Sequence, residues 1–256
     1  MSGLLASARS AAEAELAVGA GADIIDLKEP RAGALGALPP DVIRSCVALV
    51  AGRRPVSATI GDLPAEPRVV AEAVARTASL GVDFVKIGIF PGGAPESVLD
   101  VLRDQARHTR LVALLFADRK PDFGLVPRAA ECGFAGIMLD TMGKGDSGLR
   151  DALDDGSLRR FVEEAHRYGL LAGLAGSLGL ADIPALAPLG ADYLGFRGAL
   201  CGGSRTGDLD PGALREVHAA LDHASRSSRA TATAGAESAA ASLASSSPST
   251  VAAKSA

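Results

Sequence analysis

The sequence predicts a single (β/α)8 barrel, that is, a TIM barrel, followed by a Ser/Ala-rich tail. Short apolar runs alternate with longer Ala-rich amphipathic runs, which is the order of strands and helices in an α/β fold. Eight such apolar runs begin about 27 residues apart, the length of one βα unit in such a barrel. A doubly wound open sheet is the alternative. That fold would place a glycine-rich nucleotide loop after the first strand, and Ala6-Ser7-Ala8-Arg9 is not such a loop.

The expected elements follow one another in strict alternation. The predicted strands are Leu4–Ser7, Ile24–Lys28, Val56–Ile60, Phe84–Ile89, Leu111–Phe116, Gly136–Asp140, Leu171–Ala175 and Tyr193–Arg197. The predicted helices span about residues 9–20, 40–51, 66–80, 95–107, 125–132, 157–168, 179–189 and 211–224. Several helices end at a glycine, which accepts the left-handed conformation that closes a helix. A repeated Gly-Ala-Asp or Gly-Val-Asp turn then places Asp23, Asp83 and Asp192 just before a strand.

The composition changes abruptly after residue 224. Ser, Ala and Thr dominate residues 225–256, which contain few large apolar side chains. Such a segment cannot bury enough surface to offset the entropy of ordering it. We therefore expect a catalytic barrel over residues 1–224 and a disordered tail over residues 225–256.

Composition and charge exclude several classes of function. The net charge is −4 and no basic patch stands out, which argues against a nucleic-acid partner. No apolar run reaches the ~18 residues of a membrane span, and the N-terminus lacks the pattern of a signal peptide. Three widely spaced cysteines, Cys46, Cys132 and Cys201, are typical of a reducing compartment. We expect a cytoplasmic homo-oligomer with a small-molecule substrate, no membrane contact, no metal site and no cofactor.

Charged residues interrupt the apolar strands at their carboxyl ends. Asp26 and Lys28 alternate with Leu27 and so face one side of a strand. Lys86 is a lone lysine in another apolar run, Asp140 ends a third, and Lys144 follows shortly after. Active sites of TIM barrels lie at the carboxyl ends of the strands. These five residues are therefore expected to meet in the barrel mouth as a catalytic cluster.

Lysine is the residue type that this cluster repeats. The chain has only five lysines, and three of them fall in the predicted mouth. An apolar wall and a neighbouring cation lower the pKa of a lysine and free its amine to attack a carbonyl. Arginine stays protonated and cannot do this. The pattern favours a Schiff base with an aldehyde or ketone. Lysines that pair with structural acids or bind substrate phosphate are the alternative.

Small residues follow the last two strands. Gly176 and Ser177 come after the seventh strand, and Arg197 and Gly198 lie at the end of the eighth. Phosphate sites of TIM barrels are often built there, because small residues let backbone N–H groups reach an anion. Arg197 could add a forked contact to the phosphate. Tight turns without a ligand are the other explanation for the glycines.

A long loop, residues 29–37, follows the second predicted strand and borders the same mouth. It contains Gly33 and Gly36, which could act as hinges. The sequence therefore suggests a lid.

These segments together resemble the (5-formylfuran-3-yl)methyl phosphate synthase family, in order from about residue 3 to residue 222. The motifs that carry the likeness are residues 23–30 with Gly33 and Leu35-Gly36, Val56–Asp62, Phe84–Gly88, Met138–Thr141 with Lys144, Leu174–Ser177 and Gly195–Ala199. The resemblance implies a TIM-barrel lyase that condenses two molecules of glyceraldehyde 3-phosphate. The implied product is 4-(hydroxymethyl)-2-furaldehyde phosphate, with release of phosphate and water, for methanofuran biosynthesis.

The resemblance also implies roles for the cluster. Lys28 would form the Schiff base and Lys86 would accept the proton, with Asp26, Asp140 and Lys144 as supporting acid/base groups. The furan would serve a methanofuran-type cofactor or another furan product. A class I-type aldolase or isomerase acting on another sugar phosphate stays open, as does a non-catalytic barrel that binds a phosphate ligand.

Overall fold

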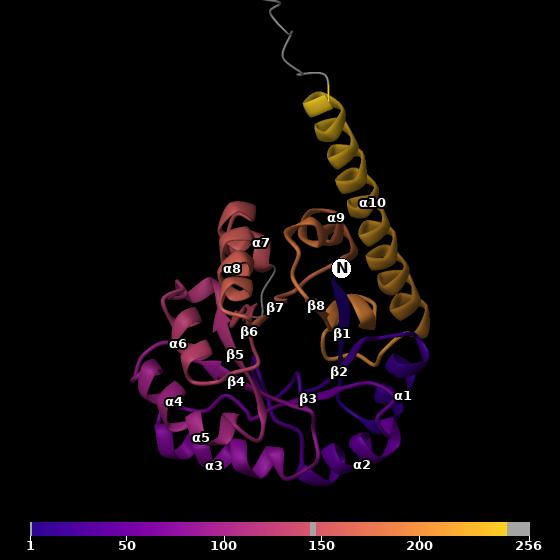
Figure 1. Ribbon diagram of the computed structural model, residues 1–256. Coiled ribbons are helices and arrows are strands. Elements are labelled where there is room, and N and C mark those ends of the chain that lie inside the picture. The colour runs from indigo at the N-terminus through magenta and orange to yellow at the C-terminus, as the bar shows by residue number, and fades with distance from the viewer. Residues whose placement is uncertain (1, 144–146, 245–256) are drawn as a thin grey trace, which may run out of the picture.

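The computed structural model is a closed barrel of eight parallel strands (Figure 1). The structure describes residues 2–143 and 147–244, with backbone only from residue 228 onward. Strands pair in sequence order, and β8 closes the barrel by pairing with β1. The strands are β1 (Gly3–Ala8), β2 (Ile24–Leu27), β3 (Val56–Thr59), β4 (Phe84–Ile89), β5 (Arg110–Phe116), β6 (Gly136–Asp140), β7 (Leu171–Leu174) and β8 (Tyr193–Phe196). The predicted TIM barrel is therefore confirmed.

Helices surround the barrel on its outside (Figure 1). They are α1 (Ala11–Gly19), α2 (Pro40–Val50), α3 (Pro67–Ala78), α4 (Pro95–Val101), α5 (Arg103–Ala106), α6 (Leu125–Glu131), α7 (Leu149–Ala152), α8 (Asp155–Arg167), α9 (Ile183–Leu186) and α10 (Pro211–Ala244). Two predicted helices are broken into shorter pieces, one over 95–107 and the other over 179–189. Four strands end one residue earlier than predicted, so Lys28, Ile60, Ala175 and Arg197 each lie just past a strand.

Alternation along the strands divides the core into two parts. One face of each strand packs against the helices, in a large aliphatic cluster that includes Ile25, Leu27, Val85 and Ile87. The other face points into the barrel and forms a smaller cluster around Leu5, Ile24, Phe84, Val112, Leu114, Phe116 and Met138. Asp26 and Lys86 occupy this inner face, where an apolar side chain would otherwise continue the filling of the barrel.

The repeated Gly-Ala-Asp and Gly-Val-Asp turns join neighbouring strands at the amino end of the barrel. In each repeat, the carboxylate accepts a hydrogen bond from a backbone N–H in the preceding strand. The three bonds run from Leu4 N to Asp23 at 2.8 Å, from Val56 N to Asp83 at 2.8 Å and from Ala172 N to Asp192 at 2.7 Å. The repetition of this turn in the sequence thus has a structural cause, because each carboxylate binds a donor at the barrel's amino end.

The last helix is longer than the sequence suggested. Its first part packs on the barrel through Leu214, Val217 and Leu221, whereas its distal part projects away from the barrel (Figure 1). The prediction ended this helix at residue 224, and the structure continues it to Ala244. Alanine has the highest intrinsic helix propensity, which favours continuation of the helix. The domain boundary at residue 225 stays a prediction, and residues 245–256 of the expected tail lie outside the described residues.

No helix within residues 2–143 and 147–244 combines the length and apolar character needed to cross a bilayer.

Candidate active site

A cavity of about 450 Å³ opens at the carboxyl ends of β7, β8, β1 and β2. Asp26, Lys28, Lys86 and Asp140 all line it, although they come from three different strands and one strand end. Four of the five predicted catalytic residues are therefore brought together as expected. The fifth, Lys144, lies outside the described residues.

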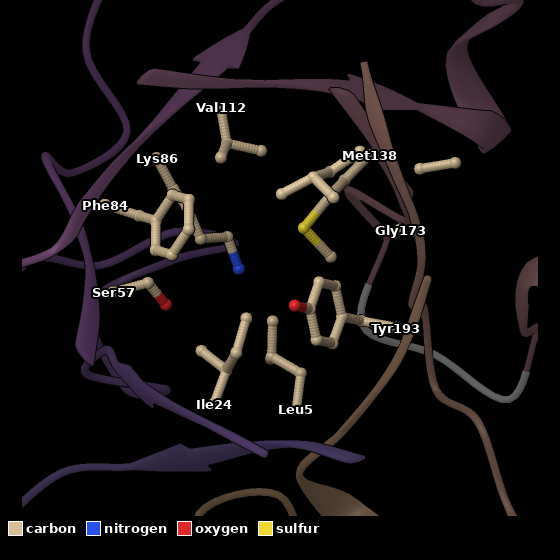
Figure 2. A pocket seen from close by; sticks show the side chains of 11 residues that line it. Leu5, Ile24, Ser57, Phe84, Lys86, Val112, Met138, Gly173 and Tyr193 are labelled. Atoms are coloured by element: carbon tan, nitrogen blue, oxygen red, sulfur yellow. The ribbon is translucent and has the colours of Figure 1, made fainter. Parts of the chain in front are cut away.

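A buried ion pair forms the floor of this cavity. The Lys86 Nζ lies 3.0 Å from Asp26 Oδ1, and neither side chain is more than 3% exposed. Figure 2 shows the Lys86 amine extending from β4 towards the barrel axis, above Leu5 and Ile24. Asp26 also accepts hydrogen bonds from the Ser57 hydroxyl at 2.6 Å and the Ser7 hydroxyl at 3.2 Å. The carboxylate is thus held in place by three donors.

Opposing effects act on Asp26. Burial disfavours its charged form, but the charges of Lys86 and Lys28 and the Ser57 hydrogen bond outweigh burial and lower the pKa of Asp26 below its ordinary value. Asp26 is consequently ionised at neutral pH. A carboxylate that carries its charge beside an amine can exchange a proton with it, which suits proton transfer.

Lys28 is the second amine in the cavity. Its side chain is 11% exposed, and its Nζ lies 3.9 Å from Asp140 Oδ2, an ion-pair distance that is too long for a hydrogen bond. Burial is the main influence on Lys28 and lowers its pKa. Asp140 and Asp26 oppose this shift, and Lys86 and Arg205 add to it. A lowered pKa increases the fraction of neutral amine, the nucleophilic form.

The orientation of the Asp140 carboxylate is fixed by the backbone of the next residue, Thr141. Its Oδ1 accepts a hydrogen bond from the Thr141 N–H at 2.7 Å, which leaves Oδ2 directed at Lys28. The next loop residues are held by Asp118, whose two carboxylate oxygens accept from the N–H groups of Met142 at 2.8 Å and Gly143 at 2.7 Å. Asp118 follows β5 at the same end of the barrel and holds residues 142–143, which precede Lys144.

The small residues predicted to bind phosphate also line the cavity. Gly176, Ser177 and Gly198 are all part of its wall. Gly176 has φ +114°, and a Cβ placed on it would come within 3.0 Å of the Thr141 backbone nitrogen. Ser177 has φ +52°, which is uncommon for a residue other than glycine. Strained backbone of this kind often occurs at ligand sites, so this turn is a candidate anion site.

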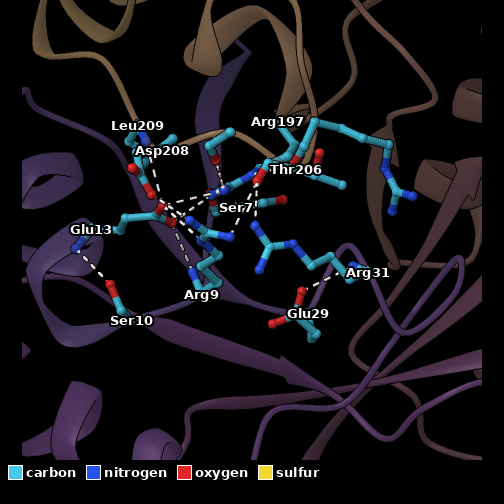
Figure 3. A network of polar contacts seen from close by, with 12 residues as sticks. Ser7, Arg9, Ser10, Glu13, Glu29, Arg31, Arg197, Thr206, Asp208 and Leu209 are labelled. Atoms are coloured by element: carbon cyan, nitrogen blue, oxygen red, sulfur yellow. Dashed lines mark hydrogen bonds and ion pairs between the residues drawn. The ribbon is translucent and has the colours of Figure 1, made fainter.

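Arg197, which was predicted to contact a phosphate, is bound by Glu13 and by backbone carbonyls. Its guanidinium makes two contacts with Glu13, at 2.5 and 3.2 Å, within the network drawn in Figure 3. Its remaining N–H groups donate to the carbonyls of Ser7 at 3.0 Å, Arg205 at 2.9 Å and Gly207 at 2.5 Å. All five N–H groups of the guanidinium therefore already have protein acceptors. This geometry argues against the expected forked contact between Arg197 and a substrate phosphate.

Arg205 is a cavity residue that sequence reasoning missed. It lies in the loop between β8 and α10, eight residues past Arg197, and it lines the same cavity. The Gly-Ser-Arg-Thr-Gly segment, residues 203–207, could have indicated it, because small flanking residues leave an arginine accessible.

The predicted lid loop is firmly attached in this structure. Leu35 is fully buried inside the barrel and packs on Gly88, where a Cβ would lie only 2.6 Å from its Cδ1. Asp62 accepts hydrogen bonds from the N–H groups of Ala34 at 2.8 Å and Leu35 at 2.6 Å. The carbonyl of Gly36, one expected hinge, accepts from the Thr59 hydroxyl at 3.0 Å. Packing and hydrogen bonds thus anchor this loop to the barrel in this structure.

Solved structures with the same fold include phosphoribosyl anthranilate isomerase from Thermus thermophilus, at TM-score 0.62 and 15% identity, over 87% of this chain and 99% of that one. Another is 3-hexulose-6-phosphate synthase from Salmonella typhimurium, at TM-score 0.60 and 15% identity, over 87% of this chain and 99% of that one. At such low identity these likenesses show the fold alone. The barrel and the lysine–carboxylate site at its strand ends define a TIM-barrel enzyme.

Sequence relatives identify the family. The family model for 4-HFC-P synthase matches residues 4–218. A relative from Methanopyrus kandleri named (5-formylfuran-3-yl)methyl phosphate synthase is 41% identical over 226 residues, covering 83% of this chain and 93% of its own length. One of the same name from Methanosarcina mazei is 38% identical, covering 79% of this chain and 92% of its own length. The chain therefore belongs to the 4-HFC-P synthase family.

Proposed function

We propose that this protein condenses two molecules of glyceraldehyde 3-phosphate into 4-(hydroxymethyl)-2-furaldehyde phosphate through an imine at Lys28. The observation that carries the proposal is the Lys28 amine, which is buried, has a lowered pKa and faces a cavity that also holds the Lys86–Asp26 pair. The names of the relatives support this product. The furan would serve a methanofuran-type cofactor or another furan metabolite.

The first step is attack of the neutral Lys28 amine on the aldehyde carbon of one triose phosphate. Loss of water gives an imine, which draws electrons from the adjacent carbon and makes its proton acidic. Lys86 and Asp26 lie together at 3.0 Å on the cavity floor and would take this proton as one acid/base unit. Asp140, at 3.9 Å from the Lys28 amine, would stabilise its charged imine. Lys144 is proposed to assist as a further acid/base group.

The later steps need no oxidant, no reductant and no cofactor. The enamine expels one phosphate and leaves an enol. The nucleophilic carbon of this enol forms a bond to the second triose, and a hydroxyl then closes the ring. Two trioses of composition C3H7O6P give a product C6H7O6P, one phosphoric acid and two waters, so the atoms balance. Hydrolysis of the imine returns the free Lys28 amine. Because the product is aromatic, the final dehydrations are favourable, and the protein mainly has to control the early proton transfer.

Borohydride trapping tests the imine directly. Wild-type protein incubated with glyceraldehyde 3-phosphate and borohydride should acquire a reduced triose adduct at Lys28, located by mass spectrometry, and the unreduced reaction should show the ultraviolet absorbance of a conjugated furan. Lys28→Ala should abolish both. Lys120→Ala is a matched control, because Lys120 follows β5 at the same end of the barrel, is exposed and does not line the cavity.

Two results would contradict the proposal. An adduct located at another lysine would remove Lys28 from its role. A trapped adduct at Lys28 without furan absorbance would instead indicate an aldolase or isomerase that acts on a sugar phosphate.

A further inference from the structure

Two arginines that follow β8, Arg197 and Arg205, line the cavity, and they differ in how their donors are used. Every N–H group of the Arg197 guanidinium is engaged by a protein acceptor, as described above. The Arg205 guanidinium makes one hydrogen bond within the described part of the chain, from Nη2 to the Gly33 carbonyl at 3.1 Å. Four of its five N–H groups are therefore available to a ligand in the cavity.

The surroundings of Arg205 indicate that its unfilled donors need an anionic partner. Its side chain is half-buried in the cavity wall. Burial lowers the pKa of Arg205, Asp140 favours its charge and Arg197 disfavours it. A partly desolvated guanidinium whose donors are mostly unfilled is costly unless a partner completes it. The partner that best fits a planar fork of N–H groups is a carboxylate or a phosphate.

The charges of the side chains that line the cavity favour an anionic ligand. The side chains on the cavity wall include the cations of Lys28, Lys86 and Arg205 and the carboxylates of Asp26 and Asp140. Arg197 is set aside here because Glu13 neutralises it. When Lys28 is protonated, three cations against two carboxylates leave one positive charge in excess. When the Lys28 amine is neutral, Arg205 remains as a wall cation with no ion pair among the described residues, because Asp26 pairs with Lys86 and Asp140 lies beside Lys28. The small residues of the Gly176–Ser177 turn leave room in the same cavity.

A buried charge network holds the loop that carries Arg205 (Figure 3). Arg197 donates to the backbone carbonyl of Arg205 itself, and Arg9 donates to the carbonyl of Thr206 at 3.1 Å. Glu13, which is 5% exposed, binds Arg197 and also accepts from the Leu209 N–H at 3.4 Å. The backbone around Arg205 is thus fixed, so the loop itself has little freedom to lose when the guanidinium binds a ligand.

We propose that Arg205 is the side chain that recognises the phosphate group of the substrate, and that Arg197, Glu13 and Arg9 are positioning residues that hold it over the cavity. This inference deepens the proposed function and rests on it for the identity of the substrate. The contact to phosphate itself can be measured without turnover.

The first experiment titrates the intact protein with inorganic phosphate by isothermal titration calorimetry. Wild type should bind phosphate with a Kd below about 10 mM. Arg205→Gln should raise this Kd by about ten- to a hundredfold, because charge-assisted hydrogen bonds are lost. Arg205→Lys keeps the charge but loses the fork, so its affinity should fall between the two. Arg119→Gln is the matched control. Arg119 is an exposed arginine that follows β5 at the same end of the barrel and does not line the cavity, and its loss should leave affinity unchanged.

The second experiment distinguishes phosphate recognition from an effect on Lys28. Borohydride trapping at Lys28 is compared for glyceraldehyde 3-phosphate and for unphosphorylated glyceraldehyde. Arg205→Gln should reduce the preference for the phosphorylated aldehyde at least about tenfold while trapping of glyceraldehyde stays near wild type.

Equal loss with both aldehydes would overturn the proposal, as would unchanged phosphate affinity in Arg205→Gln or no phosphate binding by wild type. Absence of furan in a wild type that binds phosphate through Arg205 would instead reject the condensation and leave the phosphate contact standing.

Discussion

Lys86 and Asp26 should depend on each other for their contribution to the free energy of unfolding, because they form a buried ion pair. Lys86→Met leaves the ionised Asp26 buried with only the two serine hydroxyls and the nearby Lys28 charge to stabilise it. Removing one partner of a buried ion pair costs about 3–5 kcal/mol, because the remaining charge stays desolvated. Since Asp26 keeps two hydroxyl donors, we expect about 3 kcal/mol for Lys86→Met.

That loss is large relative to the whole fold. Domains are stable by about 5–15 kcal/mol, so the variant would lose a fifth or more of the free energy of unfolding. With a shift of about 2–4 °C per kcal/mol for a domain of this size, the melting temperature should fall by about 6–12 °C. Asp26→Asn, which removes the other charge, should destabilise by a comparable amount, since the Lys86 ammonium then loses the carboxylate that lies at hydrogen-bond distance from it.

A double-mutant cycle measured by urea denaturation tests the reasoning. The double variant Asp26→Asn/Lys86→Met should lose less stability than the sum of the two single variants, by about 1–3 kcal/mol. The matched control is Arg68–Glu72 on α3, a pair of similar length at 2.9 Å with side chains 92% and 54% exposed. Its cycle with Arg68→Met and Glu72→Gln should give at most about 0.5 kcal/mol. Additivity at both pairs would refute the view that burial makes the Lys86–Asp26 pair interdependent.

Three further outcomes follow from the site. Lys28 has a lowered pKa in the folded protein. At pH values between that pKa and the ordinary lysine pKa, the unfolded chain binds more protons than the folded one, so stability rises with pH. Lys28→Met should remove this pH dependence in denaturation curves measured up to pH 10. Initial trapping rates with glyceraldehyde should likewise rise with pH and level off below the ordinary lysine pKa of about 10.4, and a rate still rising above pH 10.4 would contradict the lowered pKa. Glu13→Gln removes the partner of Arg197 and should raise KM for glyceraldehyde 3-phosphate about tenfold or more with a smaller change in kcat, whereas an equal fall of kcat at unchanged KM would contradict a role in phosphate positioning.

The sequence by itself determined the barrel and the inner cluster. Periodicity is a local property of the chain, so eight apolar runs separated by helical runs were enough to predict eight parallel strands. Alternation placed Asp26 and Lys28 on one side of the strand predicted over residues 24–28, and strand-end position indicated Lys86 and Asp140. The family likeness was also carried by these local motifs, and the family model confirms it.

Only the tertiary structure decided which arginine is free to act. Arg197 and Arg205 both come after β8 with glycines close by in the sequence, and nothing local shows which of them is free. The difference arises because Glu13, on α1 and 184 residues before Arg197 in the chain, binds the Arg197 guanidinium. In the same way, only the tertiary structure shows that the expected lid loop is anchored, because Leu35 packs in the barrel interior. Which donor meets which acceptor depends on packing between distant segments, and a one-dimensional pattern carries no information about that.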